Sequence, residues 1–408
     1  MNNHEDNYKK IMKKNIFKNK PIFIPKSLDS KLADLGMQFP AILMDGHNIE
    51  WRPGVLKAIR PVADVFIVNP VTHRMLFKDA KEKSSFKKLP YPKNINAEKL
   101  YSDPEFRMEK IIKASVEYQI KRGASLVIAP YLFAEDTDDT KFVLNLTMLS
   151  ETIKYLKDNK INLPLFAMIH IGSRAFTKTI IINSIIDRYR EGFEDNIQGF
   201  IITVDELDDR KASEESLSGL AYMAFQLSKG HDVLVNSIGG FGEILSVLGC
   251  CGFISGLGTG ETTSVKILQD TPRKIKGRSH EWTYIPEIFD YAHDSEVKKI
   301  GYKCSCSACN GAVPVDIPSK MRHFLFRKIE IMSALRNMNS RDRINFMKER
   351  IDKAHETVRF YKRKHQSPFK SNHLVVWKNI LEEAKHWTYD ESDDRLDDLL
   401  KDLESKIQ

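Results

Sequence analysis

Cysteine is scarce in this chain, with five residues in 408, and it is unevenly placed. Three cysteines fall within the six residues from Cys304 to Cys309, and the other two are the adjacent Cys250 and Cys251. A disulfide framework of the kind that holds small secreted proteins together is therefore not expected. A chain of this length can bury a large core without such crosslinks.

The sequence also lacks a long hydrophobic run. No apolar stretch approaches the roughly 18 residues that a membrane span requires, and residues 1–6 are polar. We see neither a signal peptide nor a membrane anchor in this pattern. The sequence therefore predicts a cytoplasmic protein that does not enter a membrane.

Charge is present in quantity but is distributed unevenly. The formal net charge is +8, yet residues 389–408 hold eight acids and three bases, a local net of −5. Residues 320–370 hold fifteen Lys and Arg against five Asp and Glu, a local net of +10. Aromatic residues interleave with these bases, a pattern typical of a helical face that binds nucleic acid. A solvated helix pair that packs its aromatic side chains inward explains the pattern equally well.

Apolar runs of strand length recur and alternate with stretches long enough for helices. Seven such runs cover residues 41–44, 64–68, 125–129, 165–169, 199–204, 232–235 and 252–255. Continuously apolar runs are typical of parallel strands covered on both faces, and their spacing predicts an α/β fold of the (β/α)8 TIM-barrel type. No dinucleotide-binding glycine motif follows the first run, which argues against a Rossmann fold. We expect the eighth strand either in the N-terminal region or near residues 298–302.

This pattern divides the chain into three parts. Residues 1–30 are predicted to form a lysine-rich arm, residues 31–300 the barrel, and residues 301–408 an extension with a zinc knuckle and basic and acidic helices. The extension should pack on the barrel, because a zinc knuckle alone buries too little apolar surface to be stable.

The cysteine triplet is the most specific motif. Its C-x-C-x2-C spacing places the thiols of Cys304, Cys306 and Cys309 within reach of one ion and predicts a structural zinc site. His323 is the expected fourth ligand, with His355 in reserve. Three reduced thiols without a metal, or an iron–sulfur cluster completed by a distant cysteine, are the alternatives.

Polar residues follow the predicted strands, at the end where TIM-type barrels carry their chemistry. They are Asp45, His47, Asn48, Asn69, His73, Glu135, Asp136, Asp138, Asp139, His170, Asp205, Glu206, Asn236, Ser237 and Glu261. Carboxylates around one mouth can act as nucleophile or as general acid and base. Each also has a structural explanation: a turn for Asp45, a helix cap for Asp205, a hydrogen-bonded core position for His170. The run Gly256-Leu257-Gly258-Thr259-Gly260 could cradle a phosphate, or be a plain tight turn.

These motifs resemble the tRNA-guanine transglycosylases and their DNA-acting relatives that insert 7-deazaguanine bases. The cysteine triplet matches the zinc site that follows the barrel of that family. Residues 41–46 are similar to the strand that carries its general acid/base aspartate. Residues 165–172 resemble a strand ending in Gln-Gly-Gly, with His170 in the place of Gln, and residues 234–240 resemble a strand ending in a Gly-x-Gly turn.

The resemblance implies exchange of guanine for a 7-deazaguanine base in tRNA or DNA. Asp45 would manage the proton. Glu261 or Asp205 would attack the ribose, because Ile254 stands where the family has its nucleophilic aspartate. The expected substrate contacts are His47, Asn69, His170, Gly239, Gly240 and Gly258.

Two departures leave other functions open. The nucleophile is missing from its register, and the histidine that is the family's fourth zinc ligand has no counterpart in residues 335–339. A non-catalytic zinc-containing barrel that binds nucleic acid, or that serves as a partner subunit in a homodimer or a paralogous pair, fits these departures. An unrelated barrel enzyme acting on a small phosphorylated substrate is a third reading.

Overall fold

The computed structural model describes residues 16–17, 21–26, 30–77, 83–92, 95, 97–256, 262–265 and 281–389. Its strands are β1 (Ile22–Pro25), β2 (Phe39–Asp45), β3 (Ala63–Asn69), β4 (Val127–Ile128), β5 (Leu165–Gly172), β6 (Gly199–Asp205), β7 (Asp232–Asn236), β8 (Gly252–Ser255), β9 (Trp282–Ile285) and β10 (Asp290–His293). Its α-helices are α2 (Gly46–Trp51), α3 (Pro53–Ile59), α5 (Ala97–Ser102), α6 (Pro104–Arg107), α7 (Ala114–Lys121), α8 (Thr140–Asp158), α9 (Thr179–Phe193), α10 (Glu214–Ser228), α11 (Phe241–Val247), α13 (Asp294–Lys299), α14 (Ile317–Arg336), α15 (Ser340–His365) and α16 (Asn372–Tyr389). Shorter helical turns are η1 (Ser30–Leu35), η2 (Arg60–Val62), η3 (Thr72–Leu76), η4 (Phe86–Lys88), the π-helical η5 (Met108–Lys113) and η6 (Ser173–Thr177).

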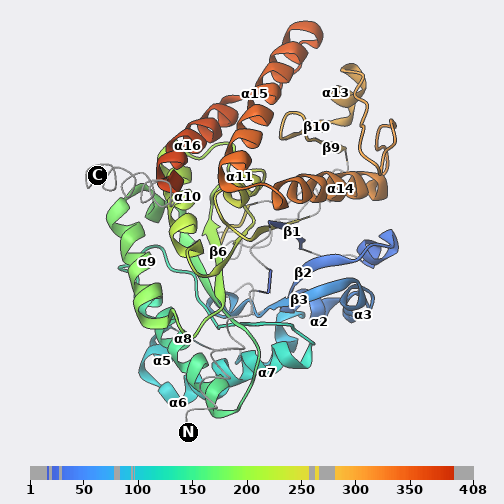
Figure 1. The fold of residues 1–408 in the computed structure, drawn as a ribbon. Helices are drawn as coiled ribbons and strands as arrows, with labels where there is room; N and C mark the ends of the chain where they lie inside the picture. The colour runs from blue at the N-terminus through green and yellow to red at the C-terminus, as the bar shows by residue number, and fades with distance from the viewer. Residues whose placement is uncertain are drawn as a thin grey trace, which may run out of the picture.

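The strands form a curled parallel sheet at the centre of the molecule (Figure 1). Six strands pair in the order β1-β8-β7-β6-β5-β4, and β2 pairs with β3. The two sheets meet at both edges, because Lys26 beside β1 bridges to Leu43 of β2, and Ser125 hydrogen-bonds to Phe66 of β3. This arrangement is consistent with the predicted TIM-type fold, and β1, in the N-terminal region, joins the seven expected strands.

In the barrel, two apolar cores arise because side chains alternate between the faces of a strand. On β2, Ile42 and Met44 belong to the outer core that packs against the helices, whereas Leu43 belongs to the core inside the barrel. Beyond the apolar residues of the inner core, the next inward-facing residues along the strands are polar, and they lie at the carboxyl ends of the strands. The inward positions are Asp45, Asn69, His170, Thr203 and Asn236, and strand register pairs Asp45 with Asn69 and Thr203 with both His170 and Asn236.

The extension after the barrel is mostly helical. Helices α14, α15 and α16 gather at the top of Figure 1, with the β9–β10 hairpin and α13 beside them. Helix α14 begins at a capping box in which Asp316 and Ser319 satisfy each other's backbone amides, and Asn339 caps α15. None of the described helices is both long and apolar enough to cross a membrane.

A buried ionic cluster joins the extension to the barrel. Glu243 of α11 is fully buried and accepts hydrogen bonds from Lys328 Nζ of α14 at 2.6 Å and from Arg350 Nη1 of α15 at 3.1 Å. The Tyr284 hydroxyl of β9 completes the cluster at 3.4 Å. Burial alone would raise the pKa of Glu243, but Lys328 and Arg350 outweigh burial and lower it.

Breaking this cluster should destabilise the whole chain. We expect Lys328→Met to reduce the free energy of unfolding by about 3–5 kcal/mol, because Glu243 would keep a buried charge with one partner fewer. The control Lys378→Met removes a partly exposed pair with Asp352 and should cost less than about 1 kcal/mol. Urea unfolding compares the two variants, and equal losses would contradict a structural role for the cluster.

The same cluster makes stability depend on pH. Because the folded-state pKa of Glu243 lies below its ordinary value of 4.5, its contribution is complete above about pH 4.5 and is lost as pH falls through the lower folded-state pKa. Urea unfolding repeated between pH 7 and pH 3 should therefore show a smaller loss on acidification in Glu243→Gln than in the wild-type chain.

Candidate metal centre and barrel-mouth site

The carboxylate of Asp45 lies buried at the end of β2. Its Oδ1 accepts a hydrogen bond from Asn69 Nδ2 at 2.9 Å, and its Oδ2 lies 3.3 Å from Lys26 Nζ. Burial alone would raise the pKa of this carboxyl, but the charges of Lys26 and Arg74 help to bring it below its ordinary value. Asp45 is therefore ionised at neutral pH, although it is inside the protein.

A hydrogen-bond network fixes the partner of Asp45. The Oδ1 of Asn69 accepts from the Tyr131 hydroxyl at 2.8 Å and from the Val71 amide at 3.1 Å. Thr72 Oγ1 donates to the Tyr131 carbonyl at 2.7 Å and accepts from the Tyr131 amide at 2.8 Å. The segments after β3 and β4 are thus tied together, so Asn69 has little freedom to turn away from Asp45.

Two imidazoles meet inside the mouth. The ring centroids of His73 and His170 are 4.8 Å apart, and His73 also stacks on Tyr131 at 5.1 Å. Burial, with the nearby charges of Arg74 and Lys26, lowers the pKa of His170 to about 3, and burial holds the pKa of His73 well below its usual value. Both rings are therefore neutral at pH 7. His170 is 2% exposed, and neither of its ring nitrogens has a hydrogen-bond partner among the described residues.

Asp205 and Asn236 lie on the neighbouring strands. Asp205 Oδ1 is 4.0 Å from His170 Nε2, which is beyond hydrogen-bonding distance, and it accepts from the Val265 amide at 2.8 Å. Asn236 Nδ2 donates to Thr203 Oγ1 at 3.1 Å. Asp205 therefore supports the short segment 262–265 and at the same time faces the histidine.

His47 contacts the guanidinium of Arg74, a residue that the sequence did not mark as a candidate. Its Nε2 lies 3.1 Å from Arg74 Nη1, and burial, followed by the charge of Arg74, lowers the pKa of His47 to about 3. Lys26 and Tyr131 were also missed, although each follows directly on a strand-like run. Arg74 comes five residues after the end of β3, so only its position next to the candidate His73 could have marked it.

Other expected contacts have structural partners or cannot be placed. A Cβ on Gly239, which has φ +61°, would lie 2.7 Å from a carboxylate oxygen of Asp209, and one on Gly240 would lie 2.8 Å from the Trp377 ring. Asp209 also accepts from the Phe241 amide at 3.0 Å, so the chain's own side chains fill the space beside both glycines. Gly258 and Glu261 lie outside the described residues.

The loop acids after β4 serve turns and a helix end. Asp136 Oδ1 accepts from the Asp138 amide at 2.9 Å, and Asp139 caps α8 by accepting from the Lys141 amide at 2.9 Å. Both contacts are local to the loop. They give these carboxylates a structural role.

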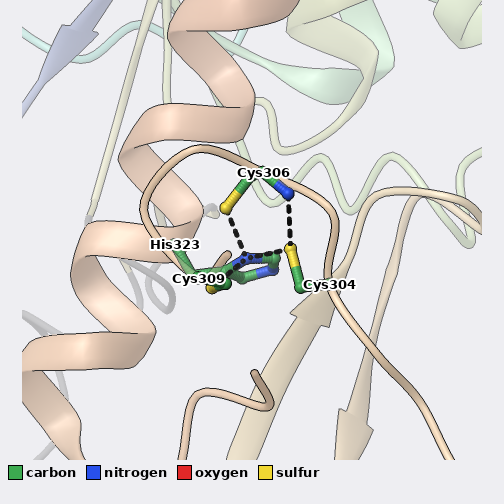
Figure 2. A group of neighbouring side chains, drawn as sticks. All are labelled: Cys304, Cys306, Cys309 and His323. Atoms are coloured by element: carbon green, nitrogen blue, oxygen red, sulfur yellow. Dashed lines mark hydrogen bonds between the residues drawn. The ribbon is translucent and has the colours of Figure 1, made fainter. Parts of the chain in front are cut away.

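The expected metal ligands come together. The Sγ atoms of Cys304, Cys306 and Cys309 lie 3.1, 3.6 and 3.4 Å from His323 Nδ1, and Figure 2 shows the three cysteines around the imidazole. All four donor atoms lie within 4.8 Å of one another. The sulfurs come from the loop before α14, and the imidazole comes from the second turn of that helix.

The residues around this cluster orient His323 and set the protonation of the thiols in a way that suits metal binding. His323 Nε2 lies 2.8 Å from the Tyr284 carbonyl, which can only accept, so Nε2 carries the proton and the Nδ1 lone pair faces the sulfurs. Burial, with Cys306 and Cys304 alongside, raises the pKa of the Cys309 thiol, so a cation is needed for the three thiols to ionise together. The cluster could therefore bind a metal ion.

Comparison with known proteins gives structural neighbours of low similarity. No family profile and no curated protein sequence matches the chain. A protein from Burkholderia cenocepacia J2315 described as a phosphonomutase aligns with a TM-score of 0.35 and 13% identity, over 58% of this chain and 86% of its own. Oxaloacetate acetylhydrolase with oxalate aligns with a TM-score of 0.35 and 14% identity, over 60% and 78%. The carboxyl transferase domain of Rhizobium etli pyruvate carboxylase with 3-bromopyruvate aligns with a TM-score of 0.39 and 10% identity, over 81% and 51%. Similarity at this level says nothing about the reaction.

The expected identity as a tRNA-guanine transglycosylase is wrong. The three solved structures named above are a mutase, a hydrolase and a carboxyl transferase, and none of these three is a transglycosylase. The structure supplies a physical reason. Ile254, where a nucleophilic aspartate would stand, pairs in register with Ile24 and Asn236 and is fully buried in the inner core. The protein is therefore not expected to exchange guanine in tRNA or DNA. Asp205 and Glu261 lose the nucleophile roles that this reaction implied.

The cluster predicts metal binding by purified protein. We expect about one metal ion per chain, and we expect His323→Gln to lose most of it because one of four ligands is removed. His355→Gln is the matched control, since His355 was the reserve ligand and is not part of the cluster. Elemental analysis after desalting measures the content. A wild-type chain without metal, or equal loss in both variants, would contradict the assignment.

Proposed function

We propose that the protein is an enzyme that moves protons on a small polar substrate held in the barrel mouth. The observation that carries the proposal is an ionised buried carboxylate, Asp45, linked through Asn69 and Tyr131 to the neutral buried imidazoles of His73 and His170. Acid–base catalysis requires groups whose surroundings push their pKa values apart, and such groups concentrate at active sites. TIM-type barrels place their chemistry at this end of the strands.

Asp45 is the proposed general base. Lys26 and Asn69 hold one carboxylate oxygen each, which fixes the direction from which the carboxylate can take a proton. A base must lie within hydrogen-bonding reach of the proton it removes, so this fixed direction determines where the substrate binds. Water is largely excluded because Asp45 is buried, and its charge therefore acts more strongly than it would in solvent.

His170 is the proposed partner of Asp45. As a neutral ring with two unpartnered nitrogens, it can donate one hydrogen bond to the substrate and accept another. Asp205, at 4.0 Å, is close enough to favour the imidazolium that forms if His170 takes up a proton during the reaction. Phe133, whose ring centroid is 5.3 Å away, keeps this part of the mouth apolar.

The test is a search for proton exchange. We expect the enzyme to convert, or to exchange with solvent deuterium, at least one member of a panel of organic acids, sugar phosphates and nucleosides, followed by NMR. Asp45→Asn should lower that rate about 10²–10⁴-fold. The control is Asp64→Asn, which changes an exposed carboxylate at the opposite end of β3 and should leave the exchange rate unchanged. No exchange anywhere in the panel, or an unchanged rate in Asp45→Asn, would refute the proposal.

We also propose that the metal is zinc and that its role is structural. Three thiolates and one imidazole suit Zn²⁺ and leave no open coordination position for a substrate. The ion would fasten the cysteine loop to α14, while the contact of His323 with the Tyr284 carbonyl extends the anchor to β9. A cytoplasmic location stays a proposal; it agrees with thiols that need a reducing compartment to remain available as ligands.

A second candidate function is nucleic-acid binding by the end of α15. Residues 357–370 contain five Lys and Arg and no acid. We call Arg359, Lys362, Arg363, Lys364 and Lys370 the α15 cationic patch, and all five are exposed. Phe360 is 48% exposed among them, with Lys364 Nζ 5.2 Å from its ring. Clustered cations contact phosphates, and an exposed aromatic ring can stack on a base. The deazaguanine ligand was expected only for guanine exchange and is not proposed again, whereas the expected pairing in a homodimer or with a paralogous subunit stays a prediction.

Salt dependence tests this second function. Lys362→Gln/Lys364→Gln should lower the slope of log affinity against log salt by about 2 for duplex DNA, because about 0.9 is lost for each phosphate contact removed. Lys154→Gln/Lys157→Gln on α8, two exposed lysines outside the patch, is the control. Fluorescence anisotropy with labelled duplex and tRNA gives the slopes. Equal slopes in the wild type and both variants would show that the α15 cationic patch does not contact nucleic acid.

A further inference from the structure

Arg74, at the barrel mouth, has no carboxylate partner in the described part of the chain. It lies in η3, and its Nη1 contacts the neutral His47 Nε2 at 3.1 Å. Its Nε is buried and has no hydrogen-bond partner, and no Asp or Glu oxygen among the described residues lies within ion-pair distance of it. A guanidinium has five donors arranged to match two acceptor oxygens side by side. Arg74 therefore has donors to spare at the candidate site.

The charges around Arg74 leave this part of the mouth positive. The charge of Arg74 helps to lower the pKa of Asp45, and that carboxylate is already held by Lys26 and Asn69. Lys26 and Arg74 together outnumber Asp45 by one positive charge. His47 does not add to this excess, because its pKa of about 3 keeps the ring neutral.

Two neutral imidazoles lie beside Arg74, because His73 is its neighbour in η3 and contacts His170. His73 and His170 carry no charge at pH 7, and both ring nitrogens of the fully buried His170 are without partners in the described part of the chain. Asp205, on the far side of His170, holds the Val265 amide. Adjacent residues in η3 thus present an imidazole toward His170 and a guanidinium toward His47.

The local backbone is held in a strained form. Val71, at the start of η3, has φ 53°, an unfavourable region for a β-branched residue. The Asn69 side chain accepts from the Val71 amide and so helps to maintain this conformation. Strain that the surroundings maintain is common where side chains are positioned for a ligand.

We propose that Arg74 is an oxyanion subsite that holds the carboxylate or phosphate group of the substrate, with His47 orienting the guanidinium. The inference rests on the proposed acid–base function, and it names the substrate as an anion. Arg74 binds the charged group, and His170 and Asp45 then face the atoms next to it. The preference of a planar guanidinium for paired oxygens applies to carboxylate and phosphate alike.

The experiment uses the full-length, metal-loaded protein with inorganic phosphate and malonate as separate probes, in calorimetric titrations at low ionic strength. We expect the wild-type chain to bind at least one probe, and Arg74→Gln to weaken that binding about tenfold or more. Arg74→Lys keeps the positive charge but loses the paired donors of the guanidinium, so its affinity for phosphate should fall less than its affinity for malonate. Arg188→Gln, an exposed arginine on α9, is the matched control and should bind like the wild type.

The outcomes separate the subsite from the proposed function. Asp45→Asn should keep the anion affinity while losing turnover, and Arg74→Gln should raise KM more than it lowers kcat. Binding that depends on Arg74 without any turnover in the wild type overturns the proposed function alone. Turnover that Arg74→Gln and Arg74→Lys leave unchanged overturns the subsite, as does equal affinity of the wild type and both variants for the probes. Far-ultraviolet circular dichroism confirms that each variant is folded.

Discussion

The buried charge of Glu243 is the constraint that ties the parts of this molecule together. A carboxylate in the interior is tolerated only with cationic and hydrogen-bonding partners around it, and here they come from α14, α15 and β9, all outside the barrel. Tyr284 links this cluster to the metal ligands, because its hydroxyl lies 3.1 Å from Lys328 Nζ while its carbonyl meets His323 Nε2. The imidazole and the ammonium sit five residues apart on one helix. The cysteine loop, the hairpin and the barrel therefore hold one another in place through Tyr284.

Strand register has the same organising role in the barrel. The inner core ends after a few apolar layers, and the next inward position is polar on β2, β3, β5, β6 and β7. On β8 the inward position level with Asn236 is Ile254 and remains apolar. The polar groups consequently gather on the arc from β2 to β7. Among the described residues, the groups that can exchange protons lie on that arc, and Ile254 of β8 offers none.

Short-range patterns predicted much of this arrangement. Seven apolar runs correspond to strands, and the triplet spacing with His323 predicted a cluster that the structure assembles. The polar mouth positions Asp45, Asn69 and His170 followed from their places at the carboxyl ends of the predicted strands. Contacts between distant segments could not be predicted: nothing near Gly239 indicates that Trp377, from α16, packs beside the glycine pair, and nothing near Arg74 indicates that it lacks a carboxylate partner. The family assignment failed for a related reason, because a cysteine motif specifies how an ion is held and not what the neighbouring barrel does.

The protonation states in the mouth follow from which groups have partners. Burial penalises charge in every side chain, so a buried group stays charged only where the protein supplies compensation. Asp45 has Lys26 and Asn69 and is ionised, whereas His170 has no hydrogen-bond partner among the residues that the structure describes and is neutral. An anion bound at Arg74 would change this balance, because it would cancel a positive charge that now helps to lower the pKa of His170. Substrate binding would then raise the pKa of that imidazole from its low value, while burial, the larger cause of the low pKa, would still act.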